Sequence, residues 1–329
     1  MEKDRVLVLI EHENGQVSPI SLKLLAAGKA LAEGRQALLS ACLIGSALGE
    51  VPGEAAFYAD EVYAVDHMSL ASYQVDLYAA SLETLTRAFL PSALLMNHTY
   101  ETVEIAPKLA HRFKSEFVPD CVDVEWDETG GLLCTKQVYG GRAIAVIGIQ
   151  GVPGVATMRC MTQEPIRPQD SKGKIIPFDV ALDSSLARSE TLTVVEGESV
   201  NLGGAEVIVS GGRGIGNMEG IELLQKLIRL LRKRFGAVEL GASRPLVDNG
   251  LLPHARQVGQ TGERVSPQIY FAIGISGSTQ HLSGMIGSRK IVAINQSDEA
   301  PIFEVSDYGV VGRHEEVLPG FIRKLEEMV

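Results

Sequence analysis

Short apolar runs that alternate with longer amphipathic stretches constrain the fold of this chain more than any other feature. The run at 6–10 is apolar throughout and is followed by a Glu-Asn-Gly turn at 13–15, which is typical of a buried strand. The next stretch, from Ser21 to Glu33, carries a helical apolar stripe, and Ser21 is its expected N-cap. Strand and helix alternating at this pace predict βαβ units built on a parallel sheet.

The same alternation continues and predicts a first domain. Further strands and helices are expected at 37–43, 61–65, 76–89, 92–96 and 103–113. Beyond about residue 118 the helical signal fades, and strand-like runs lie at 131–138, 143–149 and 191–195. Turns are expected at Gly140-Gly141 and at Val152-Pro-Gly154, and residues 164–174 have the composition of a loop. We expect these later segments to complete the first domain and to form a linker up to about residue 200.

A second domain is expected to begin at residue 201. Glu206-Val-Ile-Val-Ser210 is a buried-strand run that breaks into glycines and is followed by an amphipathic helix at about 219–235. Two later strands at 269–273 and 291–294 and a closing helix near 314–327 complete the pattern. The prediction is therefore an α/β chain with domains at 1–200 and 201–329. Each would be a mostly parallel sheet flanked by helices, and the second would be doubly wound.

Composition excludes several classes of protein. The 329 residues are 45% apolar, which is enough for two cores. The net charge of −11 is spread along the chain, whereas nucleic-acid binding needs clustered lysine and arginine. The chain has no run of about 18 apolar residues, and its N-terminus does not read as a signal peptide. We expect a cytoplasmic protein that is not inserted in a membrane and does not bind nucleic acid.

The common metal and nucleotide motifs are absent. No two cysteines are spaced as C-x-x-C, so we expect buried thiols rather than zinc or iron–sulfur ligands. Gly214-Ile-Gly216 lacks the last glycine of G-x-G-x-x-G, and Gly274-Ile-Ser276-Gly-Ser278 lacks the last glycine of G-x-S-x-G. Ser276 is therefore not expected to be a nucleophile. The cysteines are Cys42, Cys121, Cys134 and Cys160.

Glycine-rich polar segments nevertheless follow the strands of the second domain. Gly211-Gly-Arg-Gly214 follows the first strand, where glycines let the backbone approach a ligand and Arg213 can bind a phosphate or carboxylate. Gly274 opens a block at 274–285 that begins a helix, and the free N–H groups of a helix start suit an anion such as a pyrophosphate. The other segments are Gly241–Asp248, Gln257–Gly262 and Ala293–Asn295.

Taken together and in this order, these segments resemble the alpha subunit of electron transfer flavoproteins. The match continues through Ala300–Phe303, Asp307–Gly309 and Val317–Pro319. The N-terminal domain matches only in outline, through its first strand and the region of Tyr139-Gly-Gly-Arg142. The resemblance implies an FAD-binding C-terminal domain and a heterodimer with a beta subunit. It also implies an electron carrier, not an enzyme with its own substrate, that takes electrons from acyl-CoA-type dehydrogenases and passes them to a redox acceptor.

The resemblance also assigns residues to the isoalloxazine end of FAD. Arg244 would lie over the ring, and Ser243 would fix the loop that carries it. Gln260 and Thr261 would sit at the flavin edge and the ribityl chain, with the Thr261 hydroxyl in reach of N5. His281 would face the C2 carbonyl, where reduced flavin accumulates negative charge that a donor stabilises. Taken from the residues alone, His281 could instead lie on a helix surface and Arg244 could simply pair with Asp248.

The remaining assignments concern the other half of FAD. Ser276 and Gln280 would hold the pyrophosphate region and the ribityl chain, and Asn295 would contact the adenosine end. Two departures from the family pattern are a few extra residues around Arg232–Ala237, which would extend the helix by a turn, and Gly312-Arg313-His314, where the family usually has an acidic residue. The complete expected FAD set is Arg213, Ser243, Arg244, Gln260, Thr261, Gly274, Ser276, Gln280, His281 and Asn295.

Two other functions stay open at the level of sequence. In an electron-bifurcating complex the beta subunit would carry a second flavin, and the number of flavins per heterodimer would reveal it. In a thiamine- or NAD-binding oxidoreductase with a similar sheet, the protein would be colourless. An absorption spectrum separates this last function from the two flavoproteins.

Overall fold

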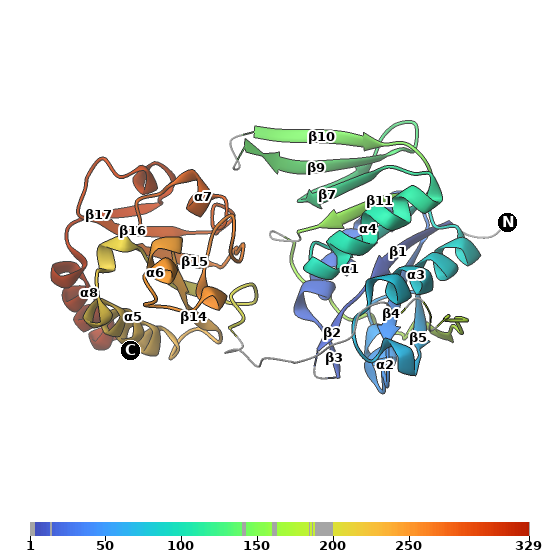
Figure 1. The fold of residues 1–329 in the computed structure, drawn as a ribbon, viewed down its shortest axis with the longest axis horizontal. Coiled ribbons are helices and arrows are strands. Elements are labelled where there is room, and N and C mark those ends of the chain that lie inside the picture. Colours follow the sequence, from blue (N-terminus) through green and yellow to red (C-terminus); the bar gives the residue numbers. More distant parts are fainter. Residues whose placement is uncertain are drawn as a thin grey trace. The chain divides into compact units, whose positions relative to one another are not determined.

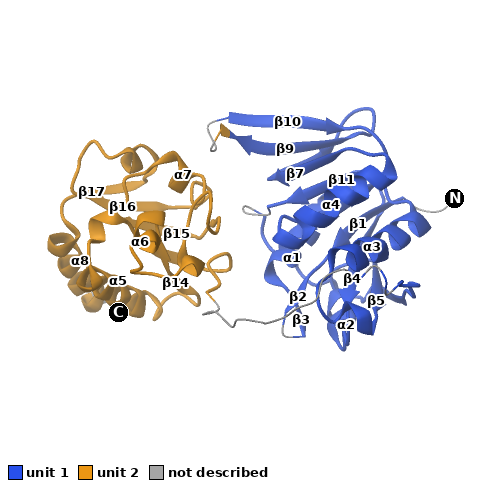
Figure 2. Ribbon diagram, in the orientation of Figure 1, with its two compact units in different colours: residues 1–138, 143–193 blue, residues 139–142, 194–329 orange. Residues whose placement is uncertain are grey.

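The computed structural model describes residues 4–13, 15–139, 143–159, 163–183, 185, 187 and 200–328. The chain divides into two compact units, Met1–Val138 with Ala143–Thr193 and Tyr139–Arg142 with Val194–Val329 (Figure 2). Parallel sheets flanked by helices occur in both units, which confirms the expected fold class. The expected domain boundary at residue 200 stays a prediction. The strand expected at 191–195, the turn at Gly140-Gly141 and Cys160 lie outside the described residues.

A seven-stranded parallel sheet forms the centre of the first unit, in the order β12-β5-β4-β1-β6-β11-β7 (Figure 1). Alternate residues of β1 point to opposite faces: Val6 and Val8 belong to one core, and Leu7 and Leu9 to the other. Its strands are β1 (Arg5–Leu9), β4 (Leu38–Gly45), β5 (Glu61–Asp66), β6 (Ala93–Asn97), β7 (Phe117–Cys121), β11 (Gly154–Met158) and β12 (Lys174–Pro177).

Helices cover both faces of this sheet. The helices α1 (Pro19–Glu33) and α2 (Val51–Ala55) pack on one face, and α3 (Val75–Phe89) and α4 (Tyr100–Phe113) pack on the other. The expected N-cap of α1 is wrong by three residues. Ser18 is the N-cap, since its side chain accepts a hydrogen bond from the Ser21 backbone N–H, and Pro19 begins the helix because proline needs no partner there.

A separate antiparallel sheet extends the first unit, in the order β10-β9-β8. Its strands are β8 (Asp123–Trp126), β9 (Leu132–Val138) and β10 (Ala143–Ile149), and β10 is an edge strand. The runs expected at 131–138 and 143–149 are therefore strands, but they do not join the parallel sheet. A two-stranded hairpin of β2 (His12–Glu13) and β3 (Gln16–Val17) occupies the turn after β1.

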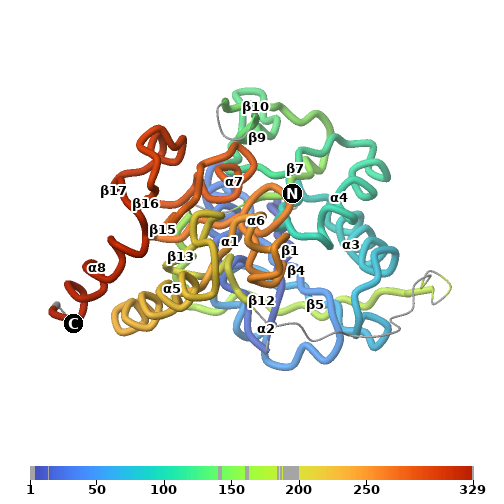
Figure 3. The backbone as a smooth tube through the Cα atoms, turned by 60° about the vertical axis from the view of Figure 1, so that its left-hand side comes forward, coloured from blue at the N-terminus to red at the C-terminus, as the bar shows by residue number. Residues whose placement is uncertain are grey.

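The second unit has a five-stranded parallel sheet in the order β14-β13-β15-β16-β17. Its strands are β13 (Val207–Gly211), β14 (Val238–Ala242), β15 (Ile269–Ile273), β16 (Ile291–Asn295) and β17 (Tyr308–Val311). Strand β13 leads through a glycine-rich loop into α5 (Met218–Leu231), which packs with α8 (His314–Met328) on one face (Figure 3). The opposite face carries the short helices α7 (Thr279–Leu282) and η6 (Pro301–Val305).

The helix expected at 219–235 ends earlier than predicted. Residues 232–234 form turns, and the Arg232 guanidinium donates to the Val238 carbonyl at 2.9 and 3.1 Å. The extra residues near 232–237 therefore make a turn between α5 and β14 and do not lengthen the helix. The remaining short helices of the described chain are η1 (Met68–Leu70), η4 (Arg213–Ile215), α6 (Arg244–Asp248) and η5 (His254–Arg256).

A buried ion pair holds the strand starts of the first unit together. Arg5 Nε lies 3.1 Å from Glu61 Oε2, and the Tyr63 hydroxyl donates to the same oxygen at 2.7 Å. Burial alone would raise the pKa of Glu61, but the hydrogen bonds from Tyr63 and Arg5 outweigh it and the pKa is lowered. The carboxylate is therefore charged in the folded chain, and removing its charge breaks the ion pair at the largely buried Arg5 guanidinium.

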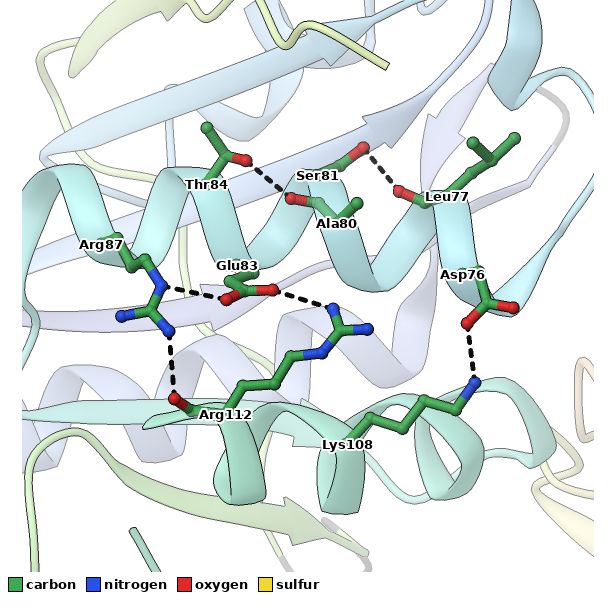
Figure 4. A network of polar contacts seen from close by, with 9 residues as sticks. All are labelled: Asp76, Leu77, Ala80, Ser81, Glu83, Thr84, Arg87, Lys108 and Arg112. Carbon is green, nitrogen blue, oxygen red and sulfur yellow. Dashed lines mark hydrogen bonds and ion pairs between the residues drawn. The ribbon is translucent and has the colours of Figure 1, made fainter. Parts of the chain in front are cut away.

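A second set of ion pairs lies on the surface of α3 and α4. Glu83 pairs with Arg87 at 2.9 Å and with Arg112 at 2.8 Å, and Asp76 pairs with Lys108 at 2.9 Å (Figure 4). These pairs are exposed to solvent, where water and salt screen them and a pair contributes about 0–1 kcal/mol. A Glu→Gln substitution should therefore lower the free energy of unfolding much more at Glu61 than at Glu83.

We expect Glu61→Gln to lower the free energy of unfolding by roughly 2–4 kcal/mol at pH 7, because it breaks a buried pair. Urea titration monitored by the fluorescence of Trp126, the one tryptophan of the chain, reports this unit. The Glu61 pKa is lowered by folding, so the difference is present at neutral pH and shrinks as the pH falls through that pKa. Glu83→Gln is the control and should cost less than about 1 kcal/mol; equal losses in the two variants would contradict this account.

Candidate functional site

One cavity of about 690 Å³ lies at the carboxyl edge of the five-stranded sheet. All ten residues expected to bind FAD line it, which brings together side chains from segments spread over 83 positions of the chain, from Arg213 to Asn295. The cavity also has lining residues outside the expected FAD set. These include Pro245, Asp248, Gln257, Gln296, Gly312, Arg313, His314 and Glu315.

The cavity runs along the ends of all five strands. A lining residue lies within two residues of the end of each strand: Ser243 for β14, Arg213 for β13, Gly274 for β15, Asn295 for β16 and Gly312 for β17. Four strand spacings separate β14 from β17, or about 19 Å at 4.7–4.9 Å per spacing. The site is therefore elongated and suits an extended ligand better than a compact one.

Backbone hydrogen bonds tie these strand ends to one another. Ser243 N donates to the Gly211 carbonyl at 2.9 Å, and Gly212 N donates to the Ile273 carbonyl at 2.8 Å. Gly274 N donates to the Ile294 carbonyl at 2.8 Å, and the Gly312 N–H donates to the carbonyl of the last residue of β16 at 2.9 Å. The loops thus leave the sheet in register, and each places its side chains beside those of the next strand.

Glycine is required where the loops after β13 and β15 touch. Gly214 N donates to the Gly274 carbonyl at 3.0 Å, and Gly274 has a φ of +64°. A Cβ at Gly274 would lie 2.9 Å from backbone atoms of Gly214, and one at Gly212 would lie 2.1 Å from the Gly274 carbonyl oxygen. No side chain fits between the two loops, so the floor of the cavity is bare backbone.

Three arginines line the cavity, and two of them are paired. Arg244 Nε lies 3.2 Å from Asp248 Oδ2, and Arg313 Nη2 lies 3.3 Å from Glu315 Oε1. Arg213 is exposed and forms no ion pair with any described residue. Arg213 is therefore the lining arginine whose charge stays available for an anionic ligand.

The helix expected after Gly274 is present but short. The helix α7 has only four residues, so it cannot supply the dipole of a long helix to an anion. Asn295, in turn, uses its amide within the protein: Nδ2 donates to the Ile275 carbonyl at 2.8 Å, and Oδ1 accepts from the Ser297 N–H at 3.0 Å. Asn295 lines the cavity and also holds the loop after β15 in place.

Two buried polar atoms at the cavity have no hydrogen-bond partner among the described residues. They are the Ser243 hydroxyl and Nδ1 of His281, in side chains that are 6% and 5% exposed. The other ring nitrogen of His281 lies 3.0 Å from the Tyr270 hydroxyl, and burial lowers the pKa of His281 to about 4. Leaving a buried polar atom without a hydrogen-bond partner costs about 1–3 kcal/mol of folding free energy, so a polar ligand that bonds to either atom would be stabilised.

These features fit FAD. An unpaired arginine suits a pyrophosphate, a backbone floor admits a close approach, and unpartnered atoms of a serine and a histidine suit the polar edge of a flavin. Tyr270, which the sequence did not single out, lies in an apolar strand where nothing in the pattern separates it from a core residue. Glu315 was not noticed in the sequence, because the four-residue strand before it, β17, was not predicted.

Comparisons with known proteins agree with this fit. The family model described as the electron transfer flavoprotein FAD-binding domain matches residues 201–286, and the one described as the electron transfer flavoprotein domain matches residues 6–183. The electron transfer flavoprotein subunit alpha of Thermoanaerobacterium thermosaccharolyticum is 35% identical over 328 residues, covering 98% of both chains. Protein FixB of Clostridium saccharobutylicum is 34% identical and covers 98% of this chain and 97% of its own. The subunit alpha of Bacillus subtilis is 32% identical and covers 98% of both.

The described part of the chain contains no group of three or more histidine, cysteine or acidic residues arranged to hold a metal ion. Within the same residues, no helix has the length and apolar character needed to span a membrane. Cys42, Cys121 and Cys134 are buried free thiols, as expected from their spacing.

We expect Gly274→Ala to abolish FAD binding and to destabilise the second unit, because its backbone is left-handed and its neighbour is rigid backbone. The left-handed conformation alone costs about 1–2 kcal/mol. Thermal unfolding and the flavin absorbance of the purified protein measure the two effects. The control is Gly320→Ala in α8, where a Cβ meets nothing within 4 Å; a variant at 274 that keeps its flavin and its Tm would refute the tight contact.

Proposed function

The chain belongs to the electron transfer flavoprotein alpha-subunit family, and from this we propose that it is the FAD-carrying subunit of a heterodimeric electron carrier. It would accept electrons from acyl-CoA-type dehydrogenases and pass them to a redox acceptor in the cytoplasm. Substrate chemistry would reside in the partner dehydrogenases and not in this chain. FAD supplies the electron-accepting ring, and the residues of the second unit bind it, orient it and set its electrostatic surroundings.

The order of the site residues across the sheet carries this proposal. Most residues assigned to the isoalloxazine end follow β14, and the residue assigned to the adenosine end closes β16. His281 follows β15, but the Gln260 N–H donates to the carbonyl of its neighbour Gln280 at 2.8 Å, which brings His281 to the β14 end. Arg213 follows β13 and Ser276 follows β15, the two strands that lie between β14 and β16. These two residues would therefore lie beside the pyrophosphate. A dinucleotide laid along the edge from β14 towards β17 would meet these groups in its own chemical order.

The charges at the β14 end support the acceptance of electrons. We propose that Arg244 lies over the flavin ring and supplies a permanent positive charge. Because burial holds the pKa of His281 near 4, the imidazole is neutral at physiological pH and would act there as a hydrogen-bond partner and not as a cation. Thr261, whose hydroxyl accepts from Gln257 Nε2 at 2.9 Å, keeps its own proton to donate towards the flavin edge.

The exposed edge strand β10 supports a permanent partner subunit. Its seven residues, AIAVIGI, include no charge and no proline, and Ile144 and Val146 are 69% and 60% exposed. Edge strands of monomeric proteins are normally protected by charges, prolines or bulges, because bare edges aggregate. Permanent interfaces, in contrast, have apolar cores. We propose that the beta subunit covers this strand.

We expect Val146→Glu to reduce recovery of the alpha–beta heterodimer at least tenfold when the two subunits are co-expressed, because it places a charge in an apolar contact. Affinity purification through a tagged beta subunit measures the ratio of the two chains. Met68→Glu is the control, since Met68 is 82% exposed in the same unit but lies away from β10. Recovery of the Val146→Glu heterodimer at the wild-type level would remove β10 from the interface.

We expect Arg244→Ala to lower the first one-electron midpoint potential of bound FAD by roughly 30–60 mV. The lower part of that range allows for the solvent exposure of the guanidinium and for its pair with Asp248. The effect should be constant from pH 6 to pH 9, because arginine keeps its proton throughout. Spectroelectrochemistry of the flavin-loaded heterodimer measures it, with Arg323→Ala in α8 as the control cation. Equal potentials in the Arg244→Ala and control variants would place the ring elsewhere.

A further inference from the structure

A buried tyrosine lies behind the histidine of the cofactor site. Tyr270 is in β15, is 0% exposed and belongs to the apolar core on the α7 face of the sheet. Its hydroxyl lies 3.0 Å from Nε2 of His281. This is the one hydrogen bond from a described side chain to the His281 ring, and it joins two residues that are both removed from solvent.

The bond decides which ring nitrogen is left for a ligand. With Nε2 occupied by Tyr270, only Nδ1 of His281 has no partner among the described residues, and His281 lines the cavity. A neutral imidazole carries one proton, so one nitrogen donates and the other accepts. The tautomer therefore determines whether His281 offers the cofactor a donor or an acceptor.

We propose that Tyr270 is a positioning residue of the cofactor site. Its hydroxyl donates to Nε2 of His281 and holds the imidazole in the tautomer that carries its proton on Nδ1. His281 then presents a hydrogen-bond donor to FAD, and a donor stabilises the added charge of the reduced ring more than it stabilises the oxidised ring. This inference rests on the proposed function, because it takes FAD to be the ligand.

The direction of the Tyr270 bond follows from the phenol's need for an acceptor. Burial raises the pKa of Tyr270, so the phenol keeps its proton inside the apolar core. Nε2 of His281 is the hydroxyl's one hydrogen-bond partner among the described residues, so the phenol proton is satisfied only if the hydroxyl donates to Nε2.

Alternative proton arrangements conflict with these surroundings. The raised pKa of Tyr270 excludes a phenolate that would take a proton from the ring, and the low pKa of His281 excludes an imidazolium at neutral pH. The remaining arrangement is the reverse tautomer, in which Nε2 donates to Tyr270 and Nδ1 accepts. In that arrangement the hydroxyl proton of Tyr270 would need another acceptor inside an apolar core.

Nitrogen chemical shifts of the imidazole test the tautomer directly. We would record them for the full chain in its heterodimer, labelled with ¹⁵N-histidine, before and after FAD is removed, and assign His281 among the seven histidines with His281→Gln. The expected result is a protonated Nδ1 in both states, and a mixture of tautomers in Tyr270→Phe. A protonated Nε2 in the wild-type protein would overturn the proposal. The cofactor-free spectrum gives this answer whether or not FAD is the natural ligand.

The flavin potential tests the consequence. Tyr270→Phe should weaken the preference of the site for reduced over oxidised FAD about tenfold, which lowers the two-electron midpoint potential by about 30 mV. Tyr308→Phe, at a residue 63% exposed on β17, is the control and should leave it unchanged. If Tyr270→Phe fails to fold, the tautomer of the wild-type imidazole still decides the proposal. A wild-type potential in folded Tyr270→Phe would overturn the positioning role, whereas a wild-type heterodimer without flavin would instead contradict the proposed function.

Discussion

The run of backbone hydrogen bonds along the carboxyl edge of the second sheet is the interaction on which the site depends. It passes from the loop after β14 to β13, then to β15, β16 and the loop after β17, with N···O distances of 2.8–2.9 Å. Each bond extends the ladder by a residue beyond the strand, so five loops leave the sheet at fixed spacing. Glycine is needed where the two middle loops meet, since a Cβ at Gly274 would collide with the backbone of Gly214. Because the loops have no freedom to separate, side chains far apart in sequence line one continuous cavity.

The cavity can bind an anionic ligand although its side chains carry little net positive charge. Two arginines are balanced by carboxylates, and Arg213 is left for the ligand. His281 adds no charge, because its burial against Tyr270 keeps it neutral. We infer that the site distinguishes oxidised from reduced cofactor through the permanent positive charge of Arg244 and the oriented, neutral imidazole of His281. Neither group titrates near pH 7.

Sequence patterns were sufficient for the parts of the fold that depend on periodicity. The strands β1, β4, β5, β6, β13, β15 and β16 all appear where apolar runs predicted them. The missed strands β8, β12 and β17 have only four residues each, β7 contains a proline, and β11 and β14 each contain a glycine in a run of five residues, so none gives a clear period. The ends of helices were less predictable: α1 starts at a proline before the expected cap, and α5 stops where Arg232 binds a backbone carbonyl instead of continuing the helix.

For the candidate site, the sequence predicted which residues line the cavity but not which hydrogen bonds they form. Glycines and polar residues after strands could be recognised in sequence because they interrupt an apolar pattern, and all ten lie on the cavity. Their roles could not be read from the pattern. The side-chain amide of Asn295 forms hydrogen bonds with backbone groups of two loops. His281 forms a hydrogen bond with Tyr270, which the sequence pattern does not distinguish from other core residues. Such pairings depend on which strands are neighbours, and the strand order is a property of the folded sheet.

We propose that FAD lies along the carboxyl edge of the second sheet, with its flavin ring at β14 and its adenosine at β16 and β17. A crystal structure of the flavin-loaded heterodimer measures this directly. We expect the isoalloxazine ring beside Arg244 and His281, the pyrophosphate within hydrogen-bonding distance of Arg213 and the loop after β15, and the adenosine beside Asn295. Density for the cofactor in the reverse direction, or on the sheet of the first unit, would contradict it.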